Sequence, residues 1–443
     1  MRLRFIPLLS LILCFLTLTL NGSQPARAQF LGADSGSPLH NLLAQTPNTL
    51  AARDTWIRFQ DYAAAFDAIE WLERPERLAS YLEEIGWVGF FYRWLSAPEQ
   101  ITSLLFSYDD TLSIVGFDLF DVDQTLTFGN PPSEAVLWRG RFNAESIAAV
   151  HEARGYTQER IDGVDAWCGP QGCASGMQVD LPNRDPNNIF DNGLGRPVPF
   201  LLLPDADQPE TLVSSPNLAV LEQVAAVTNG DTTSLAEAPD YLTLANALND
   251  PVAYPGLLIG AQFLPTEQVR YRVDFTQDDP FADFRDSPIV NALQRLSEND
   301  PRPDFLMDYA TLPEYQMAAI ADRQEGDRQL VIVALLYENA AEAEVAAPEL
   351  ARRLESFSAA LTRRAPNPLL EDVPGAVVVP RVYTDSETGL SVALVEIGYD
   401  TPTQAQQQAT AASGELMSSG RVFQILLEAF AMNELYPLWI VEG

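Results

Sequence analysis

The residue types that perform most covalent chemistry are scarce in this chain. The 443 residues include no lysine, and the histidines are His40 and His151. Schiff-base catalysis and P-loop phosphate binding both need a lysine amine, so both are excluded. Two histidines are also too few for a zinc site built from several imidazoles. His40 lies in a polar stretch typical of a linker, and His151 follows apolar residues at helical spacing, which favours a packed position over a catalytic one.

One pair of aspartates lies in a stretch that resembles a known catalytic motif. Phe120-Asp-Val-Asp-Gln-Thr-Leu126 resembles the first motif of haloacid-dehalogenase-like phosphatases. The resemblance implies a Mg²⁺-dependent hydrolase on a parallel sheet, with Asp121 as nucleophile and Asp123 as general acid and base. Gln124 replaces a glycine common in that family, Asp118 interrupts the preceding apolar strand, and the family's later lysine has no counterpart. The competing interpretation is an ordinary polar strand or turn, and the phosphatase is therefore the alternative function.

A second oxygen-rich stretch contains the candidate metal ligands. Residues 183–193 are crowded with Asp and Asn, and Ca²⁺ takes about six to eight oxygen ligands. Asp185 and Asp191 are the candidate ligands, although Ile189 stands where an EF-hand loop would have one. The competing interpretation is a long loop of turn-forming residues. No cofactor is expected unless these two aspartates bind Ca²⁺.

The N-terminus has the features of a secretory signal peptide. Arg2 and Arg4 precede an apolar stretch from Phe5 to Leu20, and Ala26-Arg27-Ala28 provides a small-x-small end. The apolar stretch is short for a bilayer span of roughly 20 residues, which favours cleavage after Ala28 over an uncleaved anchor. No later segment is apolar enough to span a membrane. We predict a signal peptide over residues 1–28 and a bacterial protein that is periplasmic, on the cell surface or extracellular.

The two cysteines of the processed chain are predicted to form a disulfide. Gly-Pro-Gln-Gly separates Cys168 from Cys173. In an oxidising compartment, a close pair around such residues is typical of a bond that closes a turn. The alternative is a redox-active pair, but that pattern has two intervening residues rather than four.

The charge of the chain limits its partners. The formal net charge is −34 at pH 7, and a field of this sign repels nucleic acid and anionic lipid surfaces while it attracts cations. We therefore predict no nucleic-acid partner. Arg352 and Arg353 lie on a predicted exposed helix, where surface ion pairs are favoured over phosphate binding. An alternative explanation of the acidic surface is the composition of the lineage.

Aromatic residues are dense between Trp56 and Trp94, where four of the seven tryptophans lie. Leu78, Tyr81, Leu82 and Ile85 recur at helical spacing and predict a helix that Gly86 ends. Aromatic side chains are most often buried in a core. The functional interpretation is an exposed surface for an envelope protein or a glycan. Within residues 86–94, Trp87, Phe91 and Trp94 are the candidate contacts.

The remaining patterns predict an α+β fold of two tandem, mainly antiparallel, ferredoxin-like units behind the aromatic-rich helical segment. Leu330 to Tyr337 is an apolar run typical of a buried strand. From there the predicted order is strand, helix, strand, strand, helix and strand, with an additional strand in front. Pro380 places the next predicted strand at a sheet edge. Asn143 and Asn339 each cap a predicted helix that follows a strand, which suggests a duplicated unit.

The predicted organisation is a signal peptide over 1–28, a flexible linker over 29–50, an N-terminal domain over 51–265 and a C-terminal domain over 266–443. Across most of this length the chain resembles uncharacterised exported bacterial proteins with no assigned activity. The points of likeness are Gly129-Asn-Pro-Pro132, the strand end Arg139-Gly-Arg-Phe142 with its helix to Tyr156, and Ser234-Leu-Ala-Glu-Ala-Pro-Asp-Tyr241. We hypothesise a non-enzymatic binding or structural protein of the bacterial envelope.

Overall fold

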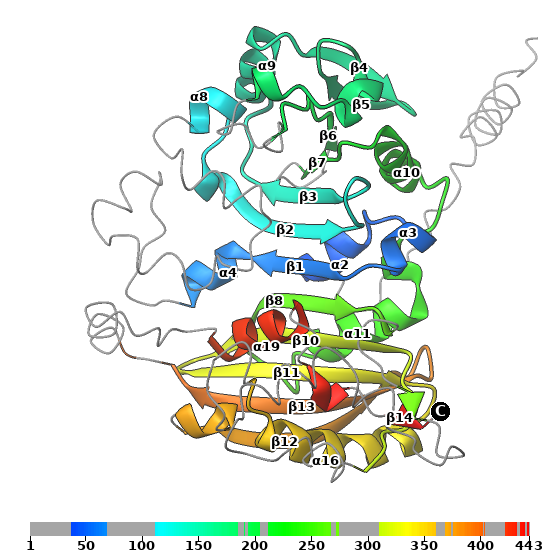
Figure 1. Ribbon diagram of the computed structural model, residues 1–443, viewed down its shortest axis with the longest axis vertical. Helices are drawn as coiled ribbons and strands as arrows, with labels where there is room; N and C mark the ends of the chain where they lie inside the picture. Colours follow the sequence, from blue (N-terminus) through cyan, green and yellow to red (C-terminus); the bar gives the residue numbers. More distant parts are fainter. Residues whose placement is uncertain are drawn as a thin grey trace, which may run out of the picture. The chain divides into compact units, whose positions relative to one another are not determined.

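A twelve-stranded sheet runs through the chain (Figure 1). Its strand order is β12-β13-β11-β10-β8-β1-β2-β3-β7-β6-β5-β4, and every neighbouring pair is antiparallel. The computed structural model describes residues 37–68, 111–184, 190, 194–203, 211–266, 272–273, 310–359, 368–373, 375–401, 403, 421–431, 435–438 and 441–442. The predicted α+β class and mainly antiparallel sheet are confirmed.

The strands of the main sheet are β1 Ile57–Asp61, β2 Val122–Phe128, β3 Ala135–Gly140, β4 Thr157–Ile161, β5 Val164–Cys168, β6 Phe200–Leu203, β7 Thr211–Ser214, β8 Leu257–Leu264, β10 Met317–Glu325, β11 Arg328–Tyr337, β12 Val377–Thr384 and β13 Ser391–Asp400. A separate parallel pair consists of β9 Arg272–Val273 and β14 Val441–Glu442. The helices are α2 Pro38–Leu43, α3 Leu50–Arg53, α4 Tyr62–Asp67, α8 Thr111–Val115, α9 Ala144–Ala153, α10 Leu218–Asn229, α11 Pro239–Asn249, α16 Ala340–Ser356 and α19 Arg421–Ala431. Within the described ranges, none of these helices combines the length and the apolar character that crossing a membrane requires.

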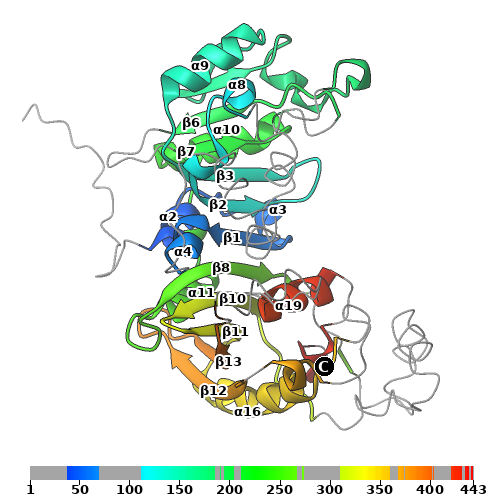
Figure 2. The same cartoon turned by 90° about the vertical axis from the view of Figure 1, so that its left-hand side faces the viewer.

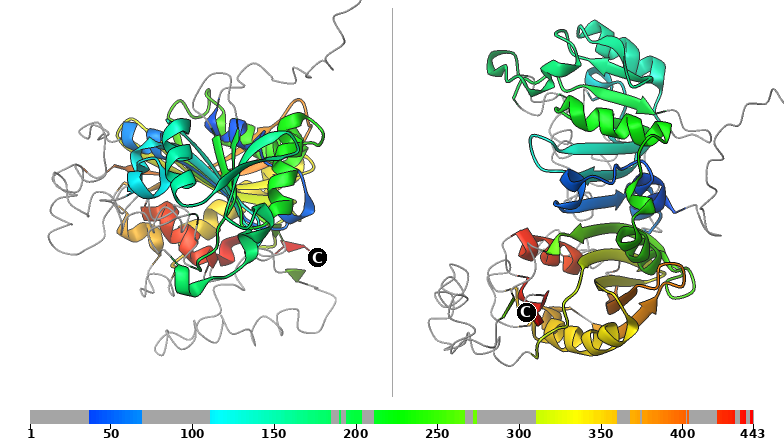
Figure 3. Two further views of the ribbon diagram at one scale, coloured as in Figure 1. Left: turned by 90° about the horizontal axis from the view of Figure 1, so that it is seen from above. Right: turned by 90° about the vertical axis from the view of Figure 1, so that its right-hand side faces the viewer.

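The core lies on both faces of the sheet. One face packs against α2, α10 and α11 in the largest apolar cluster. The opposite face carries two further clusters, one with α16 and α19 and one with α8 and α9. Figures 2 and 3 show α11 and α19 on opposite sides of the strands. Because successive side chains of a strand alternate between faces, β11 sends Ile332 into the first cluster and Val333 into the second.

The predicted domain boundary near residue 265 does not interrupt the sheet. Strand β8 lies on the N-terminal side of that boundary, yet it pairs with β1 on one side and β10 on the other. In the C-terminal half, β11, α16 and β12 form a crossover with β13 between the two strands. The last strand of a ferredoxin-like unit would lie beside β11, but β10 occupies that place and β14 pairs with β9. The ferredoxin-like units and their duplication remain predictions.

The predicted flexible linker is partly wrong. Residues 38–50 include helix α2, whose Leu39, Leu42 and Leu43 are completely buried in the largest core cluster. The predicted linker position of His40 is wrong for the same reason, since His40 Nε2 lies 2.9 Å from Asn246 Oδ1 on α11. Three leucines at helical spacing explain the packing, because they give the short helix an apolar side.

Local signals place the helix ends correctly. Asn143 Oδ1 accepts a hydrogen bond from the Ser146 backbone at 3.0 Å, and Asn339 Oδ1 accepts one from Glu342 at 3.1 Å. Each side chain satisfies an N–H group that has no partner within the first helical turn. Gly155 follows α9 with a φ of 85°, a left-handed conformation that side chains with a Cβ disfavour.

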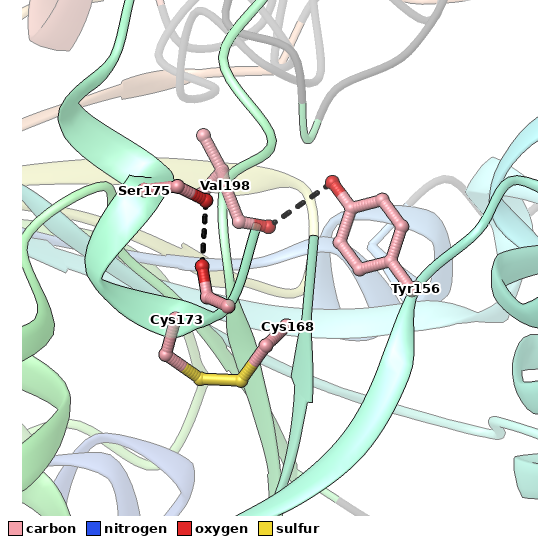
Figure 4. The surroundings of a disulfide bond; sticks show 6 residues. Tyr156, Cys168, Cys173, Ser175 and Val198 are labelled. Carbon is pink, nitrogen blue, oxygen red and sulfur yellow. Dashed lines mark hydrogen bonds between the residues drawn. A yellow bond between two sulfur atoms is a disulfide. The ribbon is translucent and has the colours of Figure 1, made fainter. Parts of the chain in front are cut away.

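The predicted disulfide is confirmed. Cys168 at the end of β5 is bonded to Cys173, which begins a short 3₁₀ helix, Cys173–Met177 (Figure 4). Nearby, Ser175 Oγ donates to the Gly172 carbonyl at 2.6 Å, and Tyr156 Oη donates to the Val198 carbonyl at 3.4 Å. The bond therefore fixes a turn whose flanks are held by independent hydrogen bonds.

Removing this disulfide is expected to destabilise the protein moderately. The cysteines are five residues apart in sequence, and closing so small a loop restricts the unfolded chain by about 2 kcal/mol. We expect the Cys168→Ala, Cys173→Ala double variant to lose about this much free energy of unfolding in urea titrations. A reductant should produce a similar loss in the wild type and none in the double variant. An unchanged unfolding midpoint in both tests would contradict a stabilising role.

Candidate functional site

A pocket of about 230 Å³ opens beside the end of β1, a strand in the middle of the sheet. Its walls come from α2, β1, α4, the loop between α11 and β8, the start of β8 and the end of β10. Most of the lining is apolar and includes Leu39, Phe59 and Leu258, while Asp61 and Arg323 supply charged groups. A concave, largely apolar site with a few polar groups is the usual form of a small-ligand site.

Asp61 is positioned by two elements at once. As the last residue of β1 it is also the N-cap of α4, and its Oδ1 accepts a hydrogen bond from Ala64 N at 2.8 Å. On the neighbouring strand β2, Gln124 Nε2 donates to Asp61 Oδ2 at 3.3 Å. The residue is only 4% exposed. A cap and a cross-strand contact thus hold the carboxyl in one orientation.

The electrostatics of Asp61 are those of a buried acid without a counter-charge. Burial raises its pKa to about 6, and the nearby carboxylates of Asp123 and Asp67 act in the same direction. The two hydrogen bonds to its oxygens act the other way, because they stabilise the charged form. Over the described part of the chain, no arginine or histidine forms an ion pair with Asp61. The group therefore changes charge close to neutral pH.

Arg323 holds the opposite wall of the pocket. Its guanidinium donates to the carbonyls of Leu248, Tyr254 and Gly256, which belong to α11 and the loop that follows it. The residue is 3% exposed, and burial lowers its pKa to about 10, so it remains charged at neutral pH. Arg323 thus ties the end of β10 to the loop that forms the wall.

The same loop is fixed by close packing and by a further polar contact. A Cβ on Gly256 would lie 2.0 Å from the Gln324 carbonyl oxygen, so only glycine fits beside β10. Tyr254 Oη donates to Glu396 Oε1 at 2.8 Å, and Glu396 forms an ion pair with Arg381. These contacts connect the loop to β12 and β13. The wall of the pocket is therefore built before any ligand binds.

The aspartates of the phosphatase motif do not form the arrangement that the resemblance implies. Asp121 lies in a short 3₁₀ turn, where its Oδ2 accepts a hydrogen bond from the Asp118 backbone at 2.9 Å. Asp123 is 16% exposed at an irregularity of β2, with one carboxylate oxygen 3.9 Å from Arg141 Nε. Strand β2 is antiparallel to both of its neighbours, β1 and β3, whereas the motif requires a parallel sheet. The alternative phosphatase function therefore lacks its structural condition.

The motif nevertheless lies next to the pocket. Gln124, the residue that departs from the phosphatase pattern, is the one that donates to Asp61. Asp61 itself was not predicted as a site residue. Because Asp61 directly precedes a helix, the sequence could have identified it as an N-cap. The residues near it in sequence give no sign that it also lines a pocket. Arg323 was not predicted as a site residue either.

Several predicted site residues lie outside the described part of the chain. These are the candidate calcium ligands Asp185 and Asp191 and the candidate contact residues Trp87, Phe91 and Trp94. The predicted signal peptide also lies outside it. Glu159 has a carboxylate oxygen within 4.8 Å of both cysteine sulfurs, but sulfurs bonded to each other are not thiolate ligands.

His151 occupies the packed position that its spacing predicts. It is fully buried on α9, with its ring 5.1 Å from Tyr156, 5.1 Å from Phe190 and 4.8 Å from Phe200, measured between ring centres. Burial lowers its pKa to about 4, and the charge of Arg154 adds to the effect. The imidazole is therefore neutral at physiological pH and serves as part of an aromatic cluster.

Comparisons with known proteins do not assign a family. No family model matches the chain, and a search of curated proteins gives no match. Matching solved structures include crystal forms III, I and IV of TP0453, with sequence identities of 6%, 7% and 8% and TM-scores of 0.29, 0.29 and 0.30. The alignments cover 84%, 83% and 84% of this chain and 97%, 98% and 98% of those chains. Likeness at these TM-scores assigns neither fold nor function.

Proposed function

We propose that this chain is an exported, non-catalytic binding protein of the bacterial envelope, whose small ligand occupies the Asp61 pocket. The N-terminal sequence and the disulfide support export, because such bonds persist in oxidising compartments. The resemblance to exported bacterial proteins is part of the same proposal. Trp87, Phe91 and Trp94 remain the candidate contacts for an envelope protein or a glycan.

The composition of the pocket supports binding more than catalysis. Among its described lining residues, none is a serine, cysteine, histidine or lysine. Nucleophilic catalysis needs an activated side chain with a base within hydrogen-bond reach, and Asp61 instead accepts hydrogen bonds from a backbone amide and a glutamine. A single buried carboxyl in an apolar pocket is suited to orienting a bound molecule.

The proposal is tested by filling the pocket. Leu258 lines it at the start of β8, so Leu258→Trp should occupy the ligand volume. We expect small amphiphilic fragments that bind the wild-type protein in ligand-observed NMR to lose at least about tenfold in affinity in this variant. Val252→Trp is the matched control, because Val252 lies in the same loop region and is 90% exposed. Fragments that bind both variants equally well would place the ligand site elsewhere.

A further inference from the structure

We infer that the ligand of the Asp61 pocket is a small organic cation, an amine with an apolar body, whose ammonium group is bound by the Asp61 carboxylate. This inference rests on the proposed binding function and adds the chemical class of the ligand. It depends on the buried position of Asp61, on the lack of an ion pair to Asp61 among the residues that the structure describes, and on the largely apolar lining of the pocket.

The carboxyl of Asp61 has capacity for another donor. Each oxygen accepts one hydrogen bond, from Ala64 N and from Gln124 Nε2, and a carboxylate oxygen has two lone pairs. Both donors are uncharged, so the negative charge is not neutralised by either of them. A buried charge that no opposite charge balances is costly, and an ammonium group would supply a positive charge and further donors.

The charged groups around Asp61 also favour a cation. Asp123 on β2 and Asp67 on α4 add negative potential at the carboxyl. On β10, the two terminal nitrogens of the Arg323 guanidinium already donate to three backbone carbonyls, and its Nε is buried. On the loop before β8, the Tyr254 hydroxyl is directed to Glu396, and on α2 the His40 ring contacts Asn246.

The rest of the pocket limits the size of the ligand. A volume of about 230 Å³ exceeds the roughly 150 Å³ that accommodates a benzene ring. Pro38, Pro255 and Leu258 line the pocket and keep part of their surface accessible, so they offer apolar contacts to a body of this size. An amine on a six-membered ring, such as cyclohexylamine, is therefore a suitable probe.

The experiment compares three probes of one shape by calorimetric titration: cyclohexylamine, cyclohexanol and cyclohexanecarboxylate. At about pH 7.5 we expect the amine to bind wild-type protein at least about tenfold more tightly than the alcohol. Its affinity should fall about tenfold at about pH 5, because a carboxyl with a pKa of about 6 is then mostly protonated. The affinity of the alcohol should change little.

Asp61→Asn should abolish the preference for the amine while leaving the alcohol bound. Asp231→Asn, at an exposed aspartate after α10, is the matched control and should bind like the wild type. If Asp61→Asn does not fold, wild-type titrations at about pH 6 in two buffers of different ionisation enthalpy should show release of about half a proton from Asp61 on amine binding.

The outcomes separate this inference from the proposed function. Equal binding of amine and alcohol overturns the inference but leaves the pocket as a ligand site. Tightest binding of the carboxylate also overturns it, because a site built around the Asp61 carboxylate would repel an anion. Amine binding that is unchanged in Asp61→Asn overturns it as well. If none of the three probes binds the wild type, both the inference and the pocket function are contradicted.

Discussion

Replacing Arg323 with methionine is expected to lower the free energy of unfolding by about 3 kcal/mol. The guanidinium donates to the carbonyls of Leu248, Tyr254 and Gly256, and methionine keeps much of the side-chain volume while removing every donor. Each buried carbonyl left without a donor costs about 1–3 kcal/mol. Part of this loss is offset, because methionine avoids the desolvation of a buried cation. Urea titrations of the wild type and the variant would measure the difference.

The matched control is Arg352→Met on α16. Arg352 is 46% exposed and forms an ion pair with Glu349 at 2.8 Å, three residues away on the same helix. An exposed pair of this kind contributes about 0.5 kcal/mol or less, so the control should unfold close to the wild type. Equal free energies of unfolding in the two variants would show that the guanidinium of Arg323 contributes no more to stability than that of a surface arginine.

The effect of Arg323 should be local as well as global. Because it connects β10 to the loop before β8, its loss should increase amide hydrogen exchange in the loop around Tyr254 and Gly256 more than in β11, where pairing on both sides protects the backbone. Arg323 thus contributes both to the pocket wall and to the stability of the fold. Because this loop lines the pocket, the affinity for a pocket ligand should decrease when the loop becomes less ordered.

Sequence patterns were sufficient where the cause is local. Asn143 and Asn339 cap helices because the donors that they satisfy lie three residues away. Pro380 lies in β12, one of the two edge strands of the sheet, because a proline has no N–H to give to a second neighbour. The disulfide could be predicted for the same reason, since its cysteines enclose a single turn.

Sequence patterns failed where the partners are distant. Arg353 was predicted to form a surface ion pair, but it is completely buried. It pairs with Glu349 on its own helix at 2.9 Å and also donates to the carbonyls of Pro437 and Ala310, which lie 84 and 43 residues away. Two adjacent arginines on one helix therefore have different roles: Arg352 forms a surface ion pair, and Arg353 connects the helix to distant segments. Only the tertiary packing determines which arginine has which role.

The candidate site was missed for the same reason. The pocket combines α2, β1, the loop after α11 and the end of β10, segments that are far apart in sequence. The phosphatase-like motif predicts Asp121 and Asp123 as site residues, whereas the buried carboxyl that lines the pocket is Asp61 on the adjacent strand. Asp61 comes next to the motif only because β1 pairs with β2, and a motif in the sequence of β2 does not indicate that pairing.

The second large effect concerns acid stability and His151. In the unfolded chain its pKa is near 6.5, and in the fold burial lowers the pKa to about 4. Between these values the unfolded state binds more protons, so the contribution of His151 to stability is present above about pH 6.5 and is lost as the pH falls towards 4. We expect His151→Phe, which suits the contacts with Tyr156, Phe190 and Phe200, to gain about 3 kcal/mol relative to the wild type between pH 7 and 4.

The pH dependence of stability that Asp61 contributes has the opposite sign to that of His151. Its pKa is raised from 3.8 to about 6 in the fold, so the folded state binds the additional proton and this contribution strengthens as the pH falls through 6. Between pH 7 and 4, Asp61→Asn should therefore lose about 2 kcal/mol relative to the wild type, while His151→Phe gains. Urea titrations of the three proteins across this range would measure both slopes. Parallel pH profiles for His151→Phe and the wild type would show that the imidazole is accessible to protons in the fold, in contradiction to its enclosure by three aromatic rings.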